Sequence, residues 1–497
     1  MKSLQHLPDR PRQRGQAIVW FLATIAACCC TFALVYNIGQ VANTKETTVN
    51  AADAAALSGA LVEARMLNFE AYTNRAMIAN EVTVAQLVSL DSLIGYANEF
   101  IQWVAIYTSI VPILDDITSA AASATEAATE VANGVLSVAI QAPEGANALL
   151  YGAREVANLA APVAAKDVSD QIASANGAQT SGNFASEGVV TYLNATNWLN
   201  FTDPYNNGSQ RDNAKNVILN SRDVWSSQRG DSKAIDFAND AMEVAGLIAS
   251  AGTGYVGLQK TSGTATLQDY DHWSAQDSID LTIGTIKFCY VVIPCGYDTH
   301  LDPTGPPIAY GRTDADADGS TGSDLCNYKP TTTNCTMAVE NSYNMYWDGP
   351  VGVGNGIPTI RDLAKDLQKP CSSSNVSDSP SLTYVVAVTK PASATQTTQQ
   401  LGMNTVNVTG PQGSPSMVDD LQGNNLTSIA AGCAFFLRPD SNKSDITEGN
   451  LARADGVHEY ASLYNPYWQA RLTTPDSKLK TLLYGLIGQP GVDGYTP

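Results

Sequence analysis

Four aspartates in a short segment form the sharpest chemical signal in this 497-residue chain. Asp314, Asp316 and Asp318 occupy alternate positions and a glycine follows them, as in loops whose carboxylates converge on a calcium ion. The twelfth position of such a loop should supply a bidentate carboxylate, but it is Leu325, and Asp324 stands one residue early. The match is partial, so the segment predicts either a Ca²⁺ site that pins an exported loop or a solvated acidic turn.

The cysteines are the second group of reactive side chains. Three of the nine are adjacent, at Cys28–Cys30, inside an apolar stretch where small thiols can pack. The other six are an even number, which is typical of disulfides in an exported protein: Cys289, Cys295, Cys326, Cys335, Cys371 and Cys433. Short loops favour the bonds Cys289–Cys295 and Cys326–Cys335, which leaves Cys371 with Cys433; buried reduced cysteines are the alternative. A zinc site is disfavoured because no CxxC pair is present.

Signals for catalysis are weak. The four histidines are scattered, and no HExxH, GxSxG or nucleophile-plus-base spacing occurs. Aspartates surround His272, and this acidic patch is more typical of a solvated face than of a hydrolytic or metal site: Asp269, Asp271, Asp277 and Asp280. We therefore expect a protein that is not an enzyme.

Composition excludes one class of partner and favours one compartment. The chain has 28 Lys and Arg against 48 Asp and Glu, a formal net charge of −20. No basic stripe is available to displace phosphate counterions, so we expect no nucleic-acid partner. Only 15% of residues are charged, below the roughly 25% of typical soluble domains. This texture is typical of an exported bacterial protein.

An apolar N-terminal segment must position everything that follows it. Residues 16–44 contain no charged side chain, and Ala17–Tyr36 is long enough to span a hydrocarbon core of about 30 Å. Basic residues cluster in 1–15, so the positive-inside rule keeps the N-terminus in the cytoplasm. We predict a single-pass protein of the bacterial inner membrane with its bulk periplasmic or extracellular. A lipoprotein signal ending at Cys28 is the alternative, although apolar residues continue well beyond it.

Helical patterning continues past the membrane segment. An alanine-rich stretch at 50–60 leads into apolar residues at 3-4 spacing, which is typical of a helix that packs on another helix: Leu87, Leu90, Ile94, Ala97, Ile101 and Val104. Pro112 should end this helix near Ile110. The pattern predicts a single rod of roughly 90 residues, with bends at Gly39 or Gly59.

Residues 118–178 are alanine-rich and predict two or three helices that fold back as an antiparallel bundle. Breaks are expected at Asn133-Gly134, at Pro143–Gly145 and at Pro162. A flexible low-complexity linker is the alternative.

Beyond residue 180 short β-branched runs appear between turn signals, which predicts a mixed region. Strands are expected at Thr282–Val292, Leu382–Val388 and Cys433–Leu437, and helices at Ile235–Ile248 and Lys478–Ile487. The predicted fold class is α+β: one transmembrane helix continues into a long helical stalk or bundle, and a loop-rich, disulfide-containing α/β exported region follows. The predicted divisions are 1–15 cytoplasmic, 16–40 transmembrane, 41–178 stalk and 179–497 exported.

Several phrases resemble one known family. Arg14–Val19 leads into the apolar segment, and Asn50–Ala60 reads NAADAAALSGA; together they resemble the TadE/TadG-like proteins of the tight-adherence (Flp) pilus machinery. Thr73–Val82 is similar to larger TadG-like members, and Tyr464–Gln469 to their C-terminal ends. The resemblance implies a bitopic inner-membrane protein that assembles or anchors an adhesive pilus. It also implies partners among pilus-assembly and pilin-like proteins, and self-association through the stalk.

Two departures from the family pattern matter. Prepilin-like members have a glutamate five residues after the processed glycine, where it neutralises the new amine. Counting from Gly15, that position is Trp20, so cleavage between Gly15 and Gln16 is not expected. The DxSxS metal motif of von Willebrand factor A domains is absent. The predicted function is a structural pilus-associated membrane protein, with a pilin-like or minor-subunit role open; the alternative is a membrane-anchored adhesin with a calcium-stabilised binding region.

Overall fold

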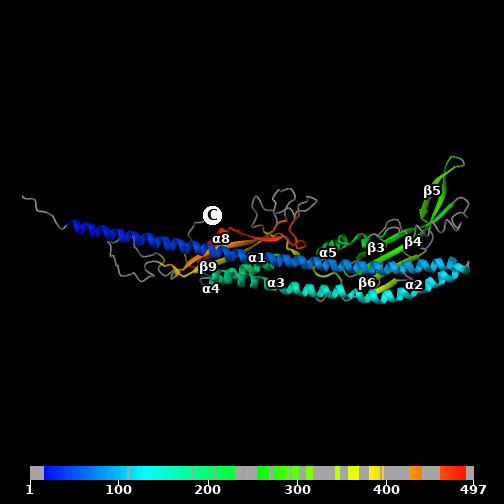
Figure 1. The fold of residues 1–497 in the computed structure, drawn as a ribbon, viewed down its shortest axis with the longest axis horizontal. Coiled ribbons are helices and arrows are strands. Elements are labelled where there is room, and N and C mark those ends of the chain that lie inside the picture. Colours follow the sequence, from blue (N-terminus) through cyan, green and yellow to red (C-terminus); the bar gives the residue numbers. More distant parts are fainter. Residues whose placement is uncertain are drawn as a thin grey trace, which may run out of the picture.

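The computed structural model describes residues 16–108, 112–180, 184–205, 208–227, 229, 239, 254–267, 270, 272–290, 293–301, 309–316, 342–346, 356–365, 367–368, 380–391, 394–396, 425–438 and 459–487. The structure is organised around a 93-residue helix, α1 (Gln16–Thr108). Figure 1 shows α1 as one rod along the whole molecule, with its N-terminal part projecting beyond the other elements. The predicted long helix is confirmed. The structure combines helices with sheets, as the predicted α+β class requires.

Neither predicted bend interrupts α1, which is helical through Gly39 and Gly59. Gly59 has another role: a Cβ there would overlap the ring of Tyr384. The missing side chain lets a strand approach the helix closely.

Two helices return along α1 and cover one side of it (Figure 1). They are α2 (Pro112–Ala139) and α3 (Gln141–Ala175). The predicted breaks at Asn133-Gly134, Pro143–Gly145 and Pro162 are wrong, because these residues lie inside α2 and α3, whose junction is at Ile140. Ala161 and Ala165, which flank Pro162, are fully buried, so tertiary packing outweighs the hydrogen bond that proline removes.

Two sheets lie against α1 at different heights. The first has the order β1-β9-β10-β11 and is antiparallel throughout. The second has the order β3-β4-β6-β7 with β5 paired to β4, and only β6 and β7 are parallel. A short antiparallel pair, β2 with β8, meets α1 between the two sheets, where Asn74 of α1 donates to the backbone of Arg361 in β8.

The strand bounds are β1 (Gln179–Thr180), β2 (Thr202–Pro204), β3 (Gly254–Leu267), β4 (His272–Tyr290), β5 (Ile293–Leu301), β6 (Ala309–Asp316), β7 (Ser342–Tyr346), β8 (Arg361–Leu363), β9 (Ser381–Lys390), β10 (Leu426–Phe436) and β11 (Trp468–Thr473). The remaining helices are α4 (Phe184–Leu199), α5 (Gly208–Asn220), α6 (Val224–Ser227) and α8 (Ser477–Ile487). The three predicted strands overlap β4, β9 and β10, and α8 confirms the C-terminal helix. The predicted helix at 235–248 lies outside the described residues except for Asn239.

Much of the core lies between α1 and the two sheets, and a further cluster lies where α4 and α8 pack against the first sheet. Near the first sheet the helix presents small alanines, and a Cβ at Gly432 of β10 would overlap the carbonyl of Ala56. Near the second sheet Leu87 and Ile94 pack against the apolar cluster that contains Trp273 of β4. The apolar seam at 87–104 was expected to contact another helix. Leu87 and Ile94 pack against a cluster that includes Leu136 of α2 as well as Trp273 of β4, so the seam meets a sheet in addition to a helix.

Candidate functional site

A buried seam on α1 packs against α3 and the strands and carries five buried polar side chains. Its members follow each other at strict 4-3 spacing, which places them on one face of the helix, and each is at most 3% exposed: Glu63, Leu67, Glu70, Asn74, Met77, Glu81, Val84, Val88 and Asp91. We call these residues the buried seam. Each polar member except Glu63 meets a partner on α3 or on a strand.

Asn74 joins three elements at once. Its amide Nδ2 donates to the backbone oxygens of Arg361 (2.7 Å) and Leu463 (2.8 Å). Arg154 of α3 donates to Asn74 Oδ1 at 3.1 Å and to the carbonyl of Thr359 at 2.8 Å. One amide therefore fixes α1 to α3, to β8 and to the segment before β11.

Asn68, six residues before Asn74, binds the first residue of β11 through two hydrogen bonds. Its Nδ2 donates to the Trp468 carbonyl, and its Oδ1 accepts from the Trp468 N–H, both at 2.9 Å. The Trp468 ring meets Phe201 and Phe436 edge-on, with ring centroids 5.6 Å apart in each pair. The two segments that resemble larger TadG-like proteins, residues 73–82 and 464–469, thus lie where α1 contacts β11 and the residues just before it.

Glu70 and Glu81 bind amides of α3. Asn158 donates to Glu70 at 2.5 Å, and Asn147 donates to Glu81 at 3.0 Å. The indole N–H of Trp273 on β4 donates to the second Glu81 oxygen at 3.1 Å. Burial raises the pKa of Glu81 to about 7, although both hydrogen bonds favour its charged form.

The far end of the seam is tied to the second sheet. Thr313 of β6 donates to Asp91 at 2.8 Å, and burial raises the pKa of Asp91 to about 6. Ser92 donates to Asp277 of β4 at 2.9 Å and lies over the backbone of Gly311. At this height α1 therefore packs against the second sheet as well as against α2.

Asp277 corrects the acidic-patch prediction. It was expected on a solvated face, but it is fully buried and forms a salt bridge with Arg229 at 2.5 Å. His272 is also buried, at 4% exposure. Both residues lie on β4, which packs against α1. Arg229 therefore neutralises the Asp277 carboxylate inside the protein. Asp280 has its backbone in β4, and Asp269 and Asp271 lie outside the described residues.

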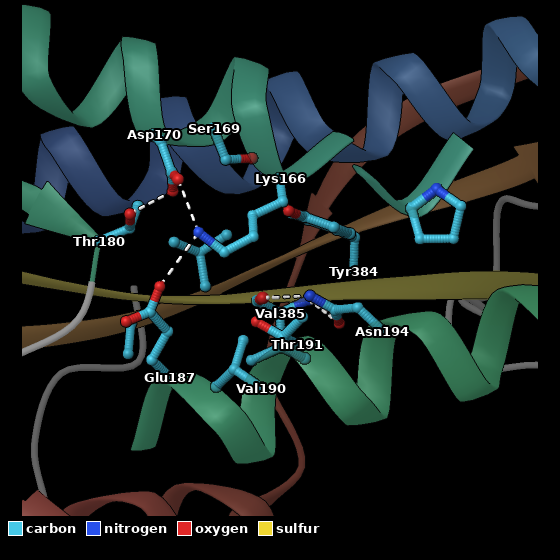
Figure 2. A pocket seen from close by; sticks show the side chains of 13 residues that line it. Lys166, Ser169, Asp170, Thr180, Glu187, Val190, Thr191, Asn194, Tyr384 and Val385 are labelled. Carbon is cyan, nitrogen blue, oxygen red and sulfur yellow. Dashed lines mark hydrogen bonds and ion pairs between the residues drawn. The ribbon is translucent and has the colours of Figure 1, made fainter. Parts of the chain in front are cut away.

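A small cavity lies between α3, α4 and β9 (Figure 2). Lys166 stands at its centre and binds Asp170 at 2.6 Å and Glu187 at 3.1 Å. Thr180 donates to Asp170, while Asn194 donates to and accepts from the backbone of Val385 at 2.8 and 3.0 Å. The Asp170 carboxylate raises the pKa of Lys166. The charged groups pair with one another, so the residues around this cavity connect α3 and α4 to the first sheet.

The predicted calcium residues fall partly on a strand. Asp314 and Asp316 have their backbones in β6, paired with β4 on one side and β7 on the other, and Asp318 and Asp324 lie outside the described residues. Within the part of the chain that the structure describes, no group of three metal-ligating side chains occurs. Calcium binding stays a prediction.

Six of the nine cysteines lie among the residues that the structure describes. Cys28, Cys29 and Cys30 are free thiols on the projecting part of α1. Cys433 is fully buried in β10 and is disulfide-bonded. Cys289 and Cys295 have their backbones in the paired strands β4 and β5, whereas Cys326, Cys335 and Cys371 lie outside the described residues. The pairings stay predictions.

Among the residues that the structure describes, α1 is the one helix long and apolar enough to cross a membrane, by length and composition. The large apolar side chains of its projecting part face outward, with Trp20 75% and Phe32 76% exposed. Helix α1 begins at Gln16, and Gly15 lies outside the described residues. Trp20 lies on the exposed helix surface, one turn after Gln16.

Sequence reasoning missed the buried seam because it counted apolar residues alone. Four of the nine seam positions are carboxylates and one is an amide, and such residues usually face water. The 4-3 spacing is nevertheless complete once polar residues are included. That regularity was the available signal.

One comparison with known proteins gives a match. Residues 15–62 match the family model described as Tad, putative Flp pilus-assembly TadE/G-like. This confirms the resemblance over the projecting part of α1 and its first contacts with the sheets. No curated protein and no solved structure matches the chain.

Proposed function

We propose that this chain is a membrane-anchored, non-enzymatic component of a Flp-type pilus-assembly system. Helix α1 serves as the anchor in a bacterial inner membrane and, without interruption, as the mount for the exported region. The N-terminus stays in the cytoplasm and is retained in the mature chain. The partners are the membrane and other pilus-assembly or pilin-like proteins.

The observation that carries this proposal is the division of α1 into an outward-facing apolar part and a buried part. Residues 17–38 expose large apolar side chains to their surroundings. From Ala51 onward the same helix is covered by α3 and the sheets. The family match at 15–62 covers both parts and their junction.

The structural role is supported by how the polar groups are used. Apart from Glu63, the buried carboxylates and the amide of the seam bind α3 or the strands, and the ionisable groups of the cavity pair with one another. An arrangement of this kind fixes the shape of the rod. It presents the exported surface at a defined height above the membrane.

The proposal is tested by deleting the gene from cells that display Flp-type pili and counting pili by electron microscopy. The full chain should restore the pili, whereas a chain with residues 1–40 replaced by a cleavable secretion signal should not, although it folds and is exported. Normal piliation in the deletion strain would overturn the proposal. Restoration by the released form would refute the anchoring role.

A further inference from the structure

We propose that the outer face of α2 and α3 is a parallel coiled-coil interface with a second copy of this chain. The inference rests on the proposed anchoring for its orientation. The proposed partner of the stalk is a second copy of the same chain.

The outer face carries a second, exposed seam. Ten residues follow each other at strict 4-3 spacing, the period of a coiled coil: Val131, Val135, Val138, Ala142, Gly145, Leu149, Gly152, Val156, Leu159 and Val163. We call them the outer seam. All are exposed, and its valines and leucines are between 61% and 77% exposed.

The seam stays on one face across the junction of the two helices. Only Ile140 separates α2 from α3, its backbone is helical (φ −66°, ψ −25°), and its N–H binds the Leu136 carbonyl at 3.1 Å. The helical phase is therefore preserved from residue 131 to 163, a length of about 48 Å. Packing against α1 uses the opposite face, which includes Leu136, Arg154 and Ala161.

The area matches what a stable dimer needs. Burying the seven large aliphatic side chains would remove roughly 700 Å² from water on each copy, and about 1,400 Å² in total lies within the range of specific interfaces. A monomer would leave this seam in water as an apolar patch larger than most soluble monomers expose.

The distribution of charge favours this face over other faces of the chain as the contact with a second copy. The chain carries a net charge of −20, so most surfaces of two copies repel each other. Between residues 131 and 163 Glu144 and Arg154 are buried, and Glu155 pairs with Arg361 at 3.1 Å. The outer seam is thus an uncharged strip on an acidic molecule.

Anchoring fixes how two copies meet. Both carry the apolar segment at the same distance from the outer seam, so a shared membrane sets them parallel and in register and raises their effective concentration. In that register Leu149 faces Leu149, and Gly145 and Gly152 face themselves. Nothing lies within 4 Å of a Cβ placed on either glycine, so the backbones can approach closely there.

The test measures the mass of the full chain in detergent and in nanodiscs by light scattering. The protein should be a dimer, and the double variant Leu149→Glu with Val156→Glu should be a monomer with unchanged helix content by circular dichroism. The matched control is Tyr192→Glu with Val224→Glu, at residues that are 70% and 79% exposed on α4 and α6; it should remain a dimer. In membranes, Leu149→Cys should form a covalent dimer on oxidation, and Val224→Cys should not.

A monomeric wild-type chain that gives no cross-link at residue 149 would overturn the inference, as a partner other than a second copy would then cover the seam. A dimer that survives the double variant would place the interface elsewhere and also overturn it. These readouts need no pili. Unchanged piliation after gene deletion, together with a seam-dependent dimer, would refute the proposed function and leave the interface standing.

Discussion

Asp91 offers the sharpest test of how the buried seam is built. It is fully buried, accepts from Thr313 at 2.8 Å and, in the amide orientation that satisfies both partners, accepts from Asn133 at 2.5 Å. The change Asp91→Asn removes the charge and keeps the shape. Both partners can reverse: the threonine hydroxyl can accept, and the Asn133 amide can turn its oxygen inward.

The magnitude follows from the pKa, which burial raises from 3.8 to about 6. The folded protein therefore binds more protons than the unfolded chain between those values, so the free energy of unfolding falls as pH rises through this window. A difference of about two pKa units corresponds to about 3 kcal/mol. The stability of Asp91→Asn relative to wild type should rise by about this amount between pH 4 and pH 7.

The assay is urea denaturation of the full chain in detergent, followed by circular dichroism at several pH values. Subtracting wild type from variant at each pH cancels the other titrating groups, which are shared. Glu130→Gln on the exposed surface of α2 is the matched control, because water solvates that side chain before and after unfolding. A difference between Asp91→Asn and wild type that stays constant with pH would refute the reasoning.

Three further predictions concern packing, the hydrogen bonds of Asn68 and the cysteines. Gly311→Ala should destabilise the protein by at least about 2 kcal/mol, because the new Cβ would overlap the Ser92 carbonyl. The control Gly134→Ala places its Cβ in open space on α2 and should be neutral or stabilising. Urea denaturation measures the free energy of unfolding of both variants. Asn68→Ala should cost about 2 kcal/mol by removing both hydrogen bonds to Trp468, and an unchanged unfolding midpoint would contradict this role of Asn68. Intact-mass measurement after alkylation without reductant should label none of the six exported cysteines, and two or more labelled thiols among them would refute three disulfides.

The long helix could be predicted because local signals agree along it. Apolar residues without charge, then alanine-rich sequence, favour helix from residue 16 to the proline at 112. The C-terminal helix, the centre of β9 and the C-terminal end of β10 were likewise readable from short-range patterns.

The arrangement of these elements could not be predicted in the same way. The contacts of Asn68 and Asn74 join residues 287 to 400 positions apart, and no local pattern records such distances. Pro162 and Gly134 read as breaks because propensity is local, whereas burial of one face against α1 decides the outcome. Asp277 read as solvated because its partner Arg229 lies 48 residues away.

The central claim is that α1 remains a membrane anchor while it carries the exported region. The most direct measurement is terminal sequencing of the chain isolated from membranes and from sheared filaments of piliated cells. The account predicts a chain in the membrane fraction that retains residues 1–15, because Trp20 offers no carboxylate to compensate a new amine in hydrocarbon. A mature chain that begins at Gln16 and is recovered in sheared filaments would contradict the account.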